Sequence, residues 1–86
     1  MPELSRFLGM VITMYFDDHP PPHFHVRYAE FRAAMAVDSG NLIAGVLPPR
    51  VASLAAEGAA LHRQELYSNW TILAAGGKVV PIEPLT

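Results

Sequence analysis

Clustered prolines set the strongest limit on how this chain can fold. The 86 residues contain eight prolines, and most of them stand at residues 20–22, at residues 48–49 and at Pro81 and Pro84. Proline lacks a backbone N–H, so these clusters cannot lie inside a central strand or a helix interior. Each proline-free stretch must therefore form a strand, a hairpin or a helix of its own.

The first half of the chain has the pattern of antiparallel strands. Apolar residues fill both alternating sets of positions in residues 7–16, which predicts one strand covered on both faces. Residues 23–28 (HFHVRY) alternate strictly, which predicts a half-buried strand with one polar face. Residues 31–38 alternate more weakly, and a turn at residues 39–41 leads into residues 42–47, so a hairpin is expected there.

The second half predicts a helix followed by an extended segment. Pro48 and Pro49 suit a first helical turn, and residues 50–75 are rich in good helix formers. One continuous helix of that length would span roughly 39 Å, and we expect Gly58 to kink or break it. Residues 78–85 contain two prolines, which confines this final segment to a sheet edge.

These segments predict a single domain over residues 1–86, of the α+β class. The expected architecture is a small antiparallel β-meander of about four strands, with one long or kinked helix packed on one face and a C-terminal edge strand. Hydrophobic residues make up 51% of the chain and charged residues 16%, so a domain this small should leave apolar surface uncovered. We expect that surplus in an oligomer or partner interface, with sheet-edge candidates at residues 33–36, residues 42–47 and the C-terminal segment.

Charge and cysteine content exclude several function classes. The formal net charge is −2 and the six basic residues form no run, so charge does not support nucleic acid as a partner. Arg50 and Arg63 could mark a helix face for nucleic acid, but Glu57 and Glu65 offset their field, and a salt-bridged solvated face is expected. The chain has no cysteine, which excludes disulfides and thiolate zinc sites. No apolar run approaches the roughly 18–20 residues of a membrane span, and no signal peptide is readable, so we expect a cytoplasmic protein without membrane contact.

The most unusual motif is DDHPPPHFH, at residues 17–25, which holds three of the four histidines and two carboxylates. His23 and His25 share one face of the predicted strand, and His19 could fold back across the proline turn. Neutral imidazoles beside carboxylates are suitable ligands for a divalent transition metal. The motif is either a solvated hairpin face or a metal site, whose candidate ligands are His19, His23, His25, Asp17 and Asp18.

The fourth histidine lies on the predicted helix. His62 shares an apolar stripe with Trp70, and Glu65 stands three residues further on, where a helix places a side-chain partner. One interpretation is a partly buried His62 bonded to Glu65, with Trp70 in the core. The alternative is that His62 and Glu65 support the histidine motif from across the sheet.

A family resemblance that extends over nearly the whole chain is carried by four sequence phrases: MYFDDHPPPHFHVRY (14–28), LIAGVLPPR (42–50), HRQELYSNW (62–70) and PIEPL (81–85). In this order they resemble a family of short bacterial proteins catalogued as domain of unknown function number forty-one sixty. Pro20 stands where that family more often has a polar residue. Its members are commonly encoded beside another small protein, similar to toxin–antitoxin modules, and some are labelled transcriptional regulators. The resemblance therefore implies a protein partner more than a metabolite.

Two functions follow as expectations. The first is a small regulatory or interaction module that acts as a homo-oligomer with a small protein partner. The alternative is a metal-dependent hydrolase or nuclease, in which His19, His23 and His25 bind the metal and Asp17 or Asp18 adds a ligand or a base. The sequence shows no nucleophile with a matching partner, so it assigns no catalytic residue.

Overall fold

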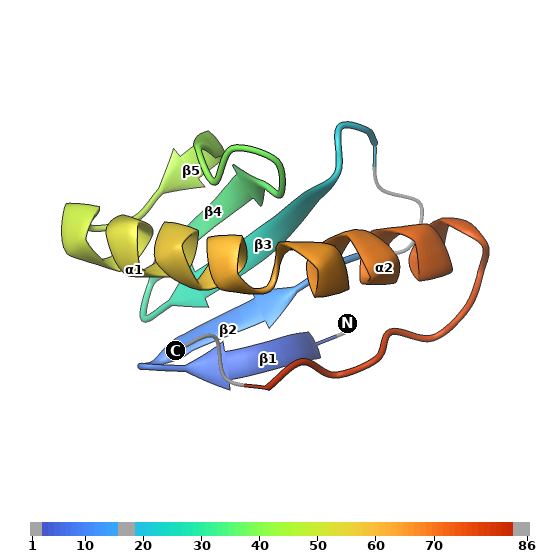
Figure 1. Ribbon diagram of the computed structural model, residues 1–86. Coiled ribbons are helices and arrows are strands. Elements are labelled where there is room, and N and C mark those ends of the chain that lie inside the picture. Colours follow the sequence, from blue (N-terminus) through green and yellow to red (C-terminus); the bar gives the residue numbers. More distant parts are fainter. Residues whose placement is uncertain (1–2, 16–18, 84–86) are drawn as a thin grey trace.

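One five-stranded antiparallel sheet, covered on one face by two helices, forms the fold (Figure 1). The computed structural model describes residues 3–15 and 19–83. The predicted α+β meander is confirmed, with five strands in the sheet rather than four, in the order of the chain. The elements are β1 (Glu3–Phe7), β2 (Met10–Thr13), β3 (His23–Tyr28), β4 (Phe31–Ala36), β5 (Leu42–Val46), α1 (Pro49–Leu61) and α2 (Arg63–Ala74).

The additional strand arises from a tight turn at Leu8 and Gly9. The prediction of one strand over residues 7–16 is wrong, because β1 and β2 form a hairpin in which Phe7 pairs with Met10. Leu8 has φ 50° and Gly9 has φ 82°, and two successive positive φ values are the signature of a two-residue hairpin turn. Leucine gives no turn signal, so the apolar run concealed the turn.

The helical layer breaks at His62 and not at Gly58. His62 has φ −117° and ψ 25°, between the end of α1 and the start of α2. Its N–H still donates to the Gly58 carbonyl at 3.1 Å, and its carbonyl accepts from the Leu66 N–H at 3.0 Å. The predicted kink at Gly58 is wrong because this buried residue stays inside α1, where packing offsets its propensity cost of about 1 kcal/mol.

Residues 78–83 run beside β1 without forming a strand (Figure 1). The Ile82 N–H donates to the Leu4 carbonyl at 2.8 Å, and the Ser5 hydroxyl donates to the Glu83 carbonyl at 3.3 Å. The predicted edge position is confirmed, but residues 78–83 do not form the predicted edge strand. Pro81 cannot donate to a ladder, so the pairing stays irregular. The end of the predicted segment, from residue 84, lies outside the described residues.

The core fills the space between the sheet and the helices. Buried side chains alternate along the strands, as Phe24 and Val26 do on β3, and they pack against Ala55, Leu66 and Leu73 of the helices. Full burial of a large apolar side chain contributes about 1.5–3 kcal/mol. In the described part of the chain, neither helix is long and apolar enough to cross a membrane.

The opposite face of the sheet carries no helix, and we call it the open face. Antiparallel partners project to the same side of a sheet, so the strand register defines the residues of this face. Two rows cross it: Thr13, His25, Ala34 and Ala44 form one, and Arg6, Val11, Arg27, Arg32 and Val46 form the other. The second row spans all five strands. β4 lies between β3 and β5, so the prediction that residues 33–36 lie at a sheet edge is wrong.

Candidate functional site on the open face of the sheet

The histidine motif forms a row of aromatic rings at the start of β3. The rings of His23 and His25 have centroids 5.2 Å apart. Tyr15 packs edge-on against His25 at 4.5 Å, and Trp70 reaches His23 from α2 at 5.2 Å. His23 Nδ1 lies 2.8 Å from the Pro21 carbonyl oxygen, a contact in which Nδ1–H is the donor. We call Trp70, His23, His25 and Tyr15 the ring row.

Of the three predicted metal ligands that the structure describes, His23 and His25 lie together. His19 is exposed, and Asp17 and Asp18 lie outside the described residues. Within residues 3–15 and 19–83, no group of three His, Cys, Asp or Glu side chains is placed to hold a metal ion. A metal site at this motif therefore stays a prediction.

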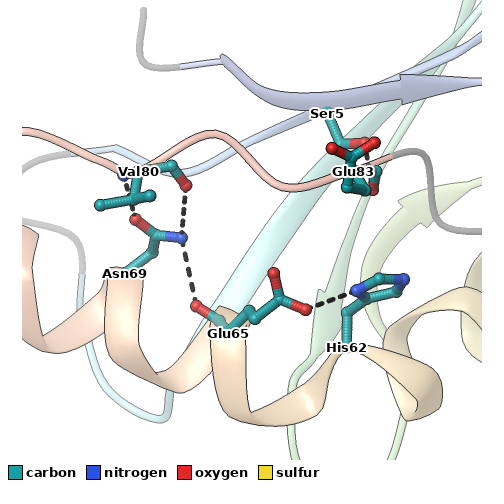
Figure 2. A network of polar contacts seen from close by, with 6 residues as sticks. All are labelled: Ser5, His62, Glu65, Asn69, Val80 and Glu83. Carbon is teal, nitrogen blue, oxygen red and sulfur yellow. Dashed lines mark hydrogen bonds and ion pairs between the residues drawn. The ribbon is translucent and has the colours of Figure 1, made fainter.

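His62 and Glu65 form a pair at the junction of the two helices. His62 Nδ1 lies 2.6 Å from Glu65 Oε1, and the imidazole is 18% exposed (Figure 2). This is the local hydrogen bond that the three-residue spacing predicts. The supporting role of this pair toward the histidine motif stays a prediction.

A hollow of about 250 Å³ lies in the open face, beside the ring row. Small residues at the centre of the sheet stand between larger side chains, which leaves the depression. Its lining includes Ala34, Ala44 and Gly45 as small residues, and Thr13, Tyr15, His25, Arg27 and Arg32 as larger ones. Aromatic and cationic groups thus border one space.

Arg27 and Arg32 are directly opposite each other on β3 and β4, and both are exposed. Like charges in this position destabilise a strand pair. Among the described residues neither arginine forms an ion pair, whereas Glu3 binds Arg6 through both carboxylate oxygens, at 2.7 and 3.0 Å. The hydrogen bond from Arg6 lowers the pKa of Glu3 below its usual value, and the charge of Arg27 lowers it further. The arginine pair is therefore a local excess of positive charge.

Sequence reasoning missed this cationic hollow. The alternation of residues 23–28 already placed Arg27 on the face of His23 and His25, which was a usable signal. Arg32 had no such signal, because only the register between β3 and β4 brings it opposite Arg27.

The hollow and the ring row lie within the part of the chain that one family model covers. Residues 9–71 match the family described as Domain of unknown function (DUF4160). Neither a curated protein nor a solved structure matches the chain significantly. The match runs from the turn between β1 and β2 into α2, and it includes every residue that borders the hollow. This chain belongs to the DUF4160 family.

Proposed function

We propose that this chain is a small cytoplasmic interaction module that works as a homo-oligomer, with β5 as the contact between copies. The observation that carries the proposal is the exposure of β5. All five of its residues are exposed, and Leu42, Ile43 and Val46 are 43, 50 and 63% exposed. A sheet edge with exposed apolar side chains favours the addition of another chain.

The two edges of the sheet differ in their cover. Residues 78–83 border the β1 edge, and the Ile82 N–H among them donates a hydrogen bond to the Leu4 carbonyl. β5 pairs with β4 on one side and has no strand on the other among the described residues. This asymmetry supports β5 as the contact.

A second copy of β5 is the occupant that we propose. Residues 39–49 contain no charged side chain, so two β5 strands can approach in antiparallel orientation without placing like charges together. Ile43 is an extra residue between the partners of Ala34 and Met35, which makes a bulge. A bulge interrupts a hydrogen-bond ladder, so the contact rests mainly on the apolar side chains.

The proposed assembly then binds a second small protein. This partner is suggested by the family resemblance, which implies a gene for another small protein beside the gene for this chain. The low charged fraction of 16% supports contact through apolar surface rather than through ion pairs. The described domain holds together without a cysteine, which suits a reducing cytoplasm. The metal-dependent hydrolase stays a second prediction, because its candidate ligands Asp17 and Asp18 lie outside the described residues.

Light scattering coupled to size-exclusion chromatography tests the β5 contact. We expect the unaltered chain to run as a dimer or larger species across the micromolar range, and Ile43→Lys to run as a monomer with an unchanged circular dichroism spectrum. Leu61→Lys is the matched control, because Leu61 is 72% exposed at the end of α1. A monomeric unaltered chain, or an Ile43→Lys variant that associates as the control does, would overturn the proposal.

A further inference from the structure

We propose that the open face binds single-stranded nucleic acid. One phosphate lies between Arg27 and Arg32, and the adjacent base lies against the rings of Tyr15 and His25. All four side chains border the same hollow. This inference concerns the open face, which adjoins the proposed β5 contact and shares Ala44 and Gly45 with it, and it goes beyond the proposed self-association.

The arginine pair supplies the phosphate site. Directly opposed residues have Cβ atoms about 4.5–5.5 Å apart, so Arg27 and Arg32 can both reach one anion. Guanidinium groups bind phosphate oxygens in bidentate geometry. A phosphate between them also removes the repulsion that the pair carries in the free protein.

The ring row supplies the surfaces for bases. Tyr15 and His25 are half-buried, so part of each ring remains accessible beside the hollow. His23 continues the row on this face, with its ring centroid 5.2 Å from that of His25. Aromatic side chains on a sheet are a common means of stacking unpaired bases, and the row offers places for bases that follow the first.

The shape of the hollow favours a strand of nucleotides over an enclosed small molecule. Its volume of about 250 Å³ lies below the roughly 300–1,000 Å³ of pockets that enclose drug-sized ligands. The centre of the hollow is lined by small residues, Ala34, Ala44 and Gly45. The backbone of a nucleic acid can therefore approach the sheet closely there. An unpaired strand can lay one nucleotide there and continue across the face.

The net charge of −2 does not oppose this assignment, because the charge on this face is positive. This face carries three of the six basic residues of the chain, Arg6, Arg27 and Arg32. The carboxylate of Glu3 forms an ion pair with Arg6. Binding should therefore be modest and strongly dependent on salt. Duplex DNA offers no unpaired base to the ring row and should bind more weakly.

Fluorescence anisotropy with a labelled single-stranded RNA of mixed sequence, measured over a salt series, tests the site. We expect Arg27→Gln/Arg32→Gln to weaken binding and to reduce the slope of log affinity against log salt by about 0.7, because the pair neutralises one phosphate of a single strand. Arg50→Gln/Lys78→Gln is the matched control, because it removes the same charge from exposed positions outside the open face. The control should keep the slope.

Tyr15 variants test the stacking part independently of charge. Tyr15→Ala should lose at least about fivefold in affinity with the salt slope unchanged, since base–aromatic stacking is worth about 1–3 kcal/mol. Tyr15→Phe keeps the ring and should bind as the unaltered chain does. Circular dichroism and thermal melting confirm that each variant is folded.

Three results would overturn the proposal. One is the absence of RNA binding at low salt. Another is an equal loss of salt slope in the arginine double variant and its control. The third is displacement of the RNA by polyglutamate at an equal concentration of charges, which would assign the face to an acidic protein segment.

Discussion

Asn69 on α2 and Val80 in the C-terminal segment are joined by two hydrogen bonds that run in opposite directions (Figure 2). The Val80 N–H donates to Asn69 Oδ1 at 2.6 Å, and Asn69 Nδ2 donates to the Val80 carbonyl at 3.0 Å. The same amide group also donates to the Glu65 carbonyl at 3.1 Å. With a side chain only 2% exposed, Asn69 fixes the extended segment to the helical layer.

We expect Asn69→Ala to destabilise the domain by about 2–3 kcal/mol, because each of three hydrogen bonds contributes about 1 kcal/mol. Urea unfolding monitored by circular dichroism measures the change. Asn41→Ala, at an exposed position in the turn before β5, is the control and should be nearly neutral. Equal effects of the two variants would mean that the Asn69 contacts contribute nothing.

Gly45 and Gly76 have nearly the same backbone conformation in different surroundings. Their φ values are +82° and +83°, but a Cβ on Gly45 would lie 2.2 Å from the Arg32 carbonyl oxygen, whereas one on Gly76 would meet nothing within 4 Å. Gly76→Ala should cost about 1–2 kcal/mol from the left-handed backbone alone. Gly45→Ala should cost clearly more, because β5 must move away from β4. The two free energies of unfolding, compared directly, check this difference.

Replacing one arginine of the opposed pair should stabilise the fold. Arg32→Gln removes the repulsion with Arg27, and we expect a gain of about 0.2–1 kcal/mol. The gain should shrink as salt is added, since exposed charges are screened. Urea unfolding at low and high salt measures both effects, and a gain that does not depend on salt would point to a cause other than charge.

Ionisation of the Tyr67 phenol should lower the free energy of unfolding at alkaline pH. Burial raises the pKa of Tyr67 above its usual value, and the hydrogen bond that its hydroxyl donates to Asp38 at 3.2 Å raises it further. The neutral phenol therefore stabilises the fold below the unfolded pKa of about 10, and this contribution is lost as pH rises through the folded pKa. Tyr67→Phe should lose stability less steeply above that pH. The difference should be smaller in an Asp38→Asn background, where the carboxylate is absent.

Trp70 and His23 are in contact but should differ in importance for stability. Trp70 packs against the core as well as on His23, so Trp70→Ala should cost near the lower end of the about 3–5 kcal/mol of a large core truncation. His23→Ala removes two ring contacts at half-exposed positions and a hydrogen bond to the local Pro21 carbonyl, and the fold should stay nearly intact. Thermal melting of both variants checks this contrast, and equal destabilisation would show that His23 is mainly structural.

Features with a local cause could be predicted from the sequence. The strict alternation of residues 23–28 gave the two faces of β3, since a strand has a period of two. The three-residue spacing gave the bond between His62 and Glu65. Pro48 and Pro49 marked the start of the helix, because the first helical turn tolerates a missing N–H.

Features that depend on distant partners could not be predicted. Leu8 adopts a positive φ because the pairing of β1 with β2 holds it there, and leucine itself has no such preference. Asn69 has no distinctive local pattern, and its role appears only when Val80 lies beside it. The facing arginines depend on the register of β3 with β4, which sequence alternation does not determine.

The straight meander order of the sheet has a consequence for how the chain folds. Every ladder joins neighbouring strands, so most pairings form between segments close in sequence, and such local topology favours fast folding. The bond between Ser5 and Glu83 is different, because it spans 78 positions. Closing a loop of that length costs more conformational entropy than any hairpin of the sheet. The C-terminal segment should therefore dock last, and native-state hydrogen exchange should find its amides opening before those of β2 and β3.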